Sequence, residues 1–182
     1  MTVYVGFNPD PIRGLYVRGL TVLGRKPVPD VRTVFAVHAT GFKEGPATFS
    51  DGEGNVLFTG RRSWNLVTFT RNSDNTVTAS YRSYDLYGSP AAGATMSADI
   101  GSIPSGTDVC VFTYDEPSNN KGTITDAMLT LGATRAKLNA IPFRGSYILI
   151  GQKGLRTGQG KEYQVNAGGA QTQITFINGV IQ

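Results

Sequence analysis

Hydrophobic and polar residues alternate along most of this chain in short runs, and this alternation predicts β-strands. After Thr33, such runs are separated by Gly41, Gly45 and the segment Asp51–Asn55; the runs are Val34–Ala39, Ala47–Phe49 and Val56–Phe58. Asp, Asn and Gly are the residues that tight turns between strands favour. The pattern therefore predicts antiparallel hairpin strands.

A second strand pair is expected at Trp64–Thr70 and Thr76–Tyr84, because the connecting segment 71–75 contains the Asn and Asp residues typical of a turn. In the first strand of this pair, alternate positions place apolar side chains on both faces. Neither face is purely polar, so we expect this strand to be buried on both sides.

Helical spacing appears only in the second half of the chain. Ser89-Pro90 has the form of an N-cap followed by proline, with Ala91 to Ile103 forming a short helix, and a second helix capped by Thr123 or Thr125 ends near Gly132. Compact apolar runs predict buried strands at Thr107–Tyr114 and Ser146–Ile150. This order of strands and helices implies crossover connections and partly parallel pairing.

The first 31 residues form an N-terminal arm with a proline linker at Pro27-Val28-Pro29 and β-prone runs at Val3–Phe7 and Leu15–Leu23. Several basic residues are spread over the arm and its junction with the domain: Arg13, Arg18, Arg25, Lys26 and Arg32. Two interpretations stay open, the solvated polar faces of strands or an arm that contacts phosphate groups.

The C-terminal tail, residues 156–182, is β-prone and carries no charge after Glu162. Gln171–Ile177 alternates polar and apolar residues before Asn178-Gly179. An exposed, uncharged strand of this kind is prone to aggregate unless it is paired. It must therefore pair either with the sheet of its own domain or with a neighbouring subunit.

Composition and length favour one folded core between these extensions. The chain has 182 residues, of which 40% are apolar and 16% charged. We expect a domain over residues 32–155 of the α+β class, rich in β-structure: a compact, sandwich-like module of mixed strands with two or three short helices.

Charge and hydropathy exclude several function classes. A net charge of +4 without clustered Lys and Arg does not indicate nucleic-acid binding. No run of about eighteen apolar residues predicts a membrane span, and Met1–Gly6 does not begin a secretion signal. We therefore expect a protein that is made in a cytoplasm, is not secreted by a signal peptide and does not enter membranes.

Candidate chemistry is sparse. His38 is the only histidine, so no cluster with zinc-ligand spacing exists, and Gly101–Gly106 lacks the Lys-Ser/Thr of a phosphate-binding loop. Cys110 is the only cysteine and lies in an apolar run, which favours a buried structural thiol over a reactive one. We expect no catalysis, no metal and no cofactor.

The acidic residues near the strand Thr107–Tyr114 are Asp108, Asp115 and Glu116. Glycoside hydrolysis requires two carboxylates that face each other across the scissile bond. Adjacent positions at a strand end point to different sides. These three residues therefore do not predict a hydrolytic pair.

A longer run of sequence carries a family resemblance. The segment Ile103–Pro117, a helix ending in Thr130-Leu131-Gly132-Ala133, and the segment Pro142–Gly154 follow one another with matching order and spacing. Together with Gly60–Val67, these segments resemble the interleukin-like EMT inducer (ILEI/PANDER-type) domain. The resemblance covers roughly Thr33 to Leu155.

The resemblance implies a compact β-sandwich with short helices that is used for binding. Where family members bind sugar, their ligands include an acidic residue after the central strand and the arginine of an F-R-D motif. These positions are Asp115 and Arg144 in this chain, with Arg62 as a weaker third and Tyr114 or Tyr147 as the aromatic face. The alternative for Asp115 and Arg144 is a purely structural salt bridge.

The chain departs from the family pattern at Gly145, which replaces the Asp of F-R-D, and at Asp115-Glu116, which replaces an Asp pair; the family's outer cysteines are absent. Known settings of the family are secreted cytokine-like proteins, the stem of a glycan-processing enzyme, cell-surface receptors and phage tail-fibre proteins. Because the chain is small and has neither a signal peptide nor the cysteines for a disulfide, the cytokine and receptor settings fit poorly, and the phage setting fits best.

We therefore expect a non-enzymatic structural or attachment protein of a bacteriophage virion, in the tail, fibre or collar. It would self-associate or bind other virion proteins through its termini, and its lectin-like module would serve either assembly or contact with a host-surface glycan. The alternative function is a free-standing carbohydrate-binding protein.

Overall fold

The computed structural model describes residues 29–182. The predicted strands and basic residues of the arm before residue 29 lie outside the described residues. The strands are β1 (Arg32–Gly41), β2 (Thr48–Asp51), β3 (Val56–Thr59), β4 (Ser63–Arg71), β5 (Val77–Tyr84), β6 (Asp108–Asp115), β7 (Ser146–Gln152), β8 (Lys161–Val165), β9 (Ala170–Ile177) and β10 (Val180–Ile181). The helices are α1 (Pro90–Ser102), the 3₁₀ turn η1 (Lys121–Thr123), α2 (Thr125–Leu129) and α3 (Arg135–Ala140).

The strands form one continuous sheet that folds back on itself as two halves. One half has the order β10-β9-β1-β2-β3, and the other has the order β5-β4-β6-β7-β8. A short parallel contact joins the halves, with Thr40 beside Tyr114 and Gly41 beside Asp115. The predicted β-rich α+β class, with mixed strands and short helices, is confirmed.

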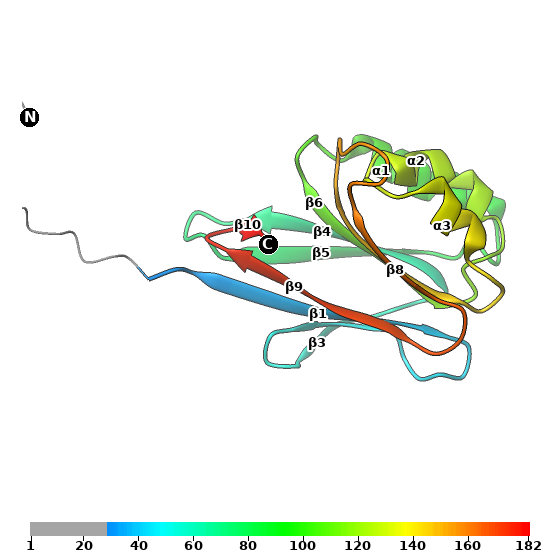
Figure 1. Ribbon diagram of the computed structural model, residues 1–182, viewed down its shortest axis with the longest axis horizontal. Helices are drawn as coiled ribbons and strands as arrows, with labels where there is room; N and C mark the ends of the chain where they lie inside the picture. The colour runs from blue at the N-terminus through cyan, green and yellow to red at the C-terminus, as the bar shows by residue number, and fades with distance from the viewer. Residues whose placement is uncertain (1–28) are drawn as a thin grey trace, which may run out of the picture.

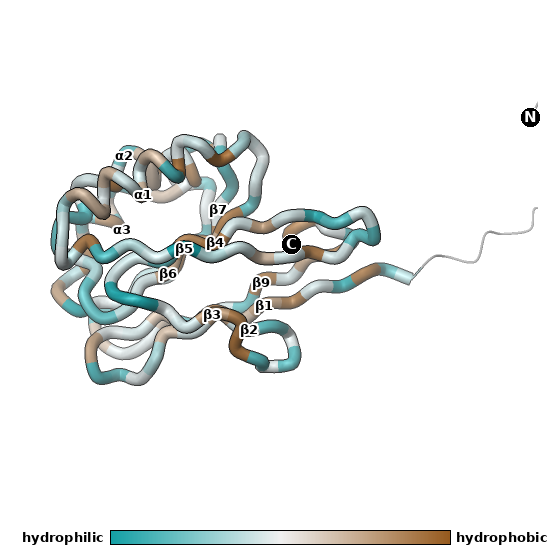
Figure 2. The backbone as a smooth tube through the Cα atoms, turned by 180° about the vertical axis from the view of Figure 1, so that it is seen from behind, coloured by the Kyte–Doolittle hydropathy of each residue, from teal (hydrophilic) through white to brown (hydrophobic). Residues whose placement is uncertain are grey.

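Three layers result, with the helices on one face of the β4-β6-β7 half and the β1-β9 half on its other face (Figure 1). The central strand β6 shows why two cores form. Its Val109 and Val111 pack against the helices, whereas Cys110 and Phe112 pack against β1 and β9. Figure 2 shows apolar segments along the strands that face each other across these layers.

The predicted burial of β4 on both faces is confirmed, since Trp64 belongs to the helix-side core and Phe69 to the core between the sheet halves. The predicted antiparallel hairpins β1–β2, β2–β3 and β4–β5 are also confirmed. In α1, the Ser89 side chain accepts a hydrogen bond from the Ala91 N–H at 3.1 Å, which is the predicted N-cap.

The predicted parallel pairing of the helix-containing half is wrong. β6 pairs antiparallel with both β4 and β7, and the one parallel pair among the described strands joins β6 to β1. The chain leaves β6 near Asp115 and re-enters β7 at Ser146, beside the same end of β6. Because η1, α2 and α3 make a round trip, β7 must run opposite to β6. The second helix also begins without a side-chain cap, since its N-cap is Ile124.

The C-terminal tail pairs within the chain's own sheet. β9 forms an eight-residue antiparallel ladder with β1, from Arg32 opposite Ile177 to Ala39 opposite Ala170. β8 pairs with β7. Within residues 29–182, no helix is long and apolar enough to cross a membrane.

Candidate functional site

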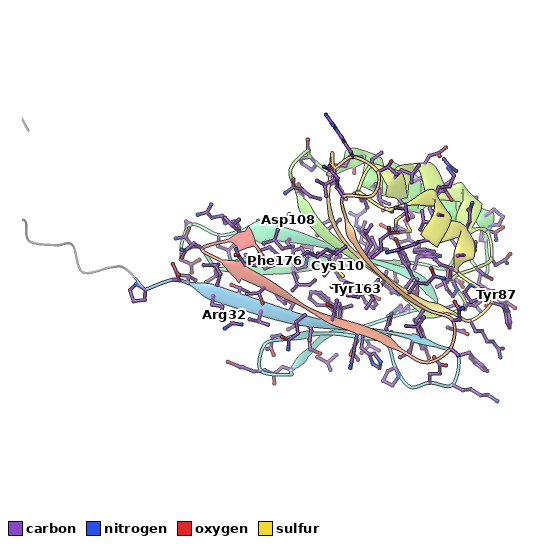
Figure 3. All side chains as sticks on the ribbon, viewed as in Figure 1. Arg32, Tyr87, Asp108, Cys110, Tyr163 and Phe176 are labelled. Atoms are coloured by element: carbon purple, nitrogen blue, oxygen red, sulfur yellow. The ribbon has the colours of Figure 1, made fainter. Side chains whose placement is uncertain are left out.

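The candidate sugar-binding residues meet where the two sheet halves join. At the end of β6, Asp115 lies beside Gly41 of β1, and the preceding Tyr114 lies opposite Ser63 of β4. This pairing brings Arg62, which precedes β4, close to Asp115. The pKa of Arg62 is raised mainly by its hydrogen bond with Asp85 and to a smaller extent by the Asp115 charge. Figure 3 shows Tyr87 of this region and Arg32 at opposite ends of the molecule.

Arg62 is held in a fixed orientation. Its Nε and Nη2 donate to the two carboxylate oxygens of Asp85 at 2.9 and 2.6 Å. This bidentate bond raises the pKa of Arg62 and lowers that of Asp85. The guanidinium also lies over the Tyr87 ring, with Cζ 4.7 Å from the ring centroid. An exposed cation on an aromatic ring therefore forms one side of the site.

Arg144 forms the other side, between two phenylalanines. Its Cζ lies 4.1 Å from the ring centroid of Phe42 and 4.8 Å from that of Phe143. Phe42 is 39% exposed and Phe143 61%, so both rings remain open to a ligand. Gly41 permits this approach, because a Cβ there would lie 2.4 Å from the Arg144 carbonyl oxygen.

Glu116 holds the backbone of Arg144 in place. Its carboxylate is almost fully buried and accepts hydrogen bonds from the Arg144 N–H at 2.7 Å and the Ser118 N–H at 2.7 Å. Asp115 and Arg144 both have left-handed backbone conformations, with φ of 63° and 59°. Such conformations are unfavourable for residues with a Cβ and persist where surrounding contacts enforce them.

The charged groups of Asp115 and Arg144 remain available. Within residues 29–182, neither side chain forms a hydrogen bond or ion pair, and the described ion pairs join other residues. The structural salt bridge considered for this pair is therefore absent among the described residues. A carboxylate that accepts and a guanidinium that donates, next to aromatic rings, can bind vicinal hydroxyl groups.

The predicted aromatic residues lie elsewhere. Tyr147 is fully buried in the helix-side core, where its hydroxyl donates to Glu162 at 2.7 Å. Tyr114 is half-buried and packs against the core between the sheet halves, because it lies on the same face of β6 as Cys110 and Phe112. The aromatic surface of the site is formed instead by Phe42, Tyr87 and Phe143.

Sequence reasoning missed these three rings and Asp85. Phe143 could have been found, since it precedes Arg144 in the motif itself. Phe42 lies in a turn between two glycines, where a large apolar side chain has no core to enter. Nothing local marks Tyr87 or Asp85, because both reach Arg62 through the β4–β5 pairing.

Asp108, the remaining acidic candidate, lies far from this site. Asp108 and Asp115 lie at opposite ends of β6, and Glu116 is committed to backbone N–H groups. No group of three potential metal ligands occurs in the described part of the chain. A cleft of about 750 Å³ lies elsewhere, between the β4–β5 hairpin and the segment before β6, and Asp108 is one of the residues that line it.

A family model for the interleukin-like EMT inducer matches residues 62–155, just over half of the chain. The chain belongs to this family. The match begins at Arg62 and includes Asp115 and Arg144, whereas Phe42 and the strands β1 and β8 to β10 lie outside it. No curated protein matches the chain.

Proposed function

We propose that this protein is a non-enzymatic structural or attachment protein of a bacteriophage particle that contacts a host-surface glycan. The observation that carries the proposal is that Asp115 and Arg144 lie beside exposed aromatic rings, while their charged groups form no hydrogen bond or ion pair within residues 29–182. Free small molecules usually bind in concave pockets. A site as open as this one suits a ligand that is part of an extended surface, such as a glycan on a host cell.

The placement of the site supports an attachment role. Tyr87, beside Arg62, lies at the end of the long axis opposite Arg32, near which the described part of the chain begins (Figure 3). A module held near Arg32 would present the opposite end to a host surface. Cys110 is the only cysteine and is fully buried, so the module lacks the disulfides typical of small secreted domains.

Glycan binding is tested on an array of bacterial surface polysaccharides with the full chain and with Arg144→Ala and Asp115→Asn. Each variant removes a charged hydrogen-bonding group, so we expect binding to fall at least about tenfold. Arg71→Ala is the matched control, because Arg71 is exposed at the far end of β4 from Arg62. Binding that survives both site variants, or no binding to any glycan, would contradict the proposed site.

The particle setting is tested separately by mass spectrometry of purified virions from the producing host. Detection of the chain at a fixed ratio to a major virion protein supports the structural role. Glycan binding by a protein that is absent from virions would favour the free-standing carbohydrate-binding protein instead.

A further inference from the structure

β9 is paired along its whole length on one edge, by β1, and over only part of its length on the other. Its other edge is covered by β10 at Phe176 and Ile177, and the Gln182 N–H donates to the Thr175 carbonyl at 3.0 Å. From Ala170 to Ile174, no described strand pairs with this outer edge.

The register shows which backbone groups this edge presents. The Thr175 carbonyl points away from β1, and backbone groups alternate in direction along a strand. The N–H and C=O groups of Gln171 and Gln173 must therefore also point outward, and their side chains are exposed on a face of the sheet. These groups form a short template for a further strand.

The space beside this edge is open. A groove of about 630 Å³ runs between β9 and β8, and Tyr163, Val165 and Gln171 are among the residues that line it. Val165 is only partly buried against the core between the sheet halves, and Tyr163 is 37% exposed. A strand added to β9 would extend the cover over both side chains.

The other described sheet edges carry protective features that β9 lacks. β5 contains Arg82, and β8 contains Lys161 and Glu162. β3 has four residues and a shift of register in its pairing with β2. Charges, short length and bulges are the features by which proteins prevent edge-to-edge pairing.

We propose that a second copy of this chain pairs its own β9 edge antiparallel with this one, forming a sheet that continues across two subunits. Identical edges meet in such a two-fold contact, so a charge at its centre would lie opposite the same charge of the other copy, and β9 carries no charge. Pairing centred on Gln171 places Gln173 opposite Gly169 of the other copy and avoids the positions that β10 occupies.

The test is sedimentation equilibrium of the full chain with Gln171→Lys and Gln171→Glu. Each variant places two like charges opposite one another, so we expect the dissociation constant of the dimer to rise about fivefold. An equimolar mixture of the two variants places opposite charges together and should restore association. Thr78→Lys adds the same charge at the β5 edge and should leave association unchanged.

A wild-type chain that is monomeric at all soluble concentrations would overturn this inference. Unchanged association of both variants, or a mixture no tighter than either variant alone, would also overturn it. The outcome is distinguishable from that of the proposed glycan site, because Gln171→Lys leaves Arg144 and Asp115 intact and its glycan binding is measured on the same array.

Discussion

Replacing Glu116 by glutamine should loosen the candidate site and destabilise the fold together. The carboxylate of Glu116 receives three hydrogen bonds, from the N–H of Arg144 and from the N–H and hydroxyl of Ser118. A glutamine has one carbonyl oxygen, which can keep the two Ser118 bonds. Its amide group would then face the Arg144 N–H, so that two buried donors meet.

The cost follows from the bonds that are lost or weakened. One bond to a charged acceptor contributes about 1.5–3 kcal/mol, and the other two change to a neutral acceptor. We therefore expect the free energy of unfolding to fall by about 3 kcal/mol. For a chain of this size, the melting temperature should fall by roughly 6–12 °C.

Glycan binding should decrease as well, because the left-handed conformation of Arg144 loses the bond that holds it. The measurements are thermal unfolding by circular dichroism and binding to whichever array glycan the wild type recognises. Glu162→Gln is the matched control, since Glu162 also accepts three hydrogen bonds, from Tyr147 and Thr134. It should lower stability without changing glycan binding.

The reasoning would be refuted if Glu116→Gln unfolded within about 0.5 kcal/mol of the wild type, which is the range of ordinary surface substitutions. Equal loss of glycan binding in Glu116→Gln and Glu162→Gln would also refute it, because the effect would then follow from general destabilisation.

Two further predictions concern groups whose pKa is raised by burial, Asp108 and Cys110. Burial raises the pKa of the Asp108 carboxyl, although the Gln152 side chain donates a hydrogen bond to it. Folding therefore favours the protonated form of Asp108, and the free energy of unfolding should decline as the pH rises above the pKa of Asp108 in the unfolded chain, near 3.8. Asp108→Asn should therefore raise the melting temperature at pH 7 and not at pH 3; an equal change at both would be inconsistent with this cause. Burial also raises the pKa of the Cys110 thiol, so the native protein should react with a thiol reagent only as fast as it unfolds, which absorbance measures directly; rapid labelling would show that the thiol is accessible.

Local pattern was sufficient to predict most elements. The apolar positions on both faces of β4 predicted its burial on both sides, the compact apolar run of β6 predicted a buried strand, and Ser89-Pro90 predicted the start of α1. It was less successful with α3 and β8, which are short and have no strong periodicity. The Phe143-Arg144 motif also marked one half of the candidate site.

Non-local pairing decided what local pattern left open. The sequence alone allowed the tail to pair with either its own sheet or a neighbour, and β9 in fact pairs with β1, more than a hundred residues earlier in the chain. The same applies to the direction of β7, which follows from the round trip of the helices. The partner of β9 and the direction of β7 depend on how whole sheet faces pack against each other, so no short segment of the sequence is sufficient to predict them.

The sequence by itself determined that the chain is β-rich and that two of its central strands are buried, and its resemblance to the family marked Asp115 and Arg144 as candidate ligands. Only the tertiary structure decided that Phe42 lies against Arg144, that Asp85 holds Arg62, and that Glu116 supports the site. Strand periodicity is a property of neighbouring residues. The site is formed by segments that meet only because β1, β4 and β6 share one sheet, and their alignment requires the whole core.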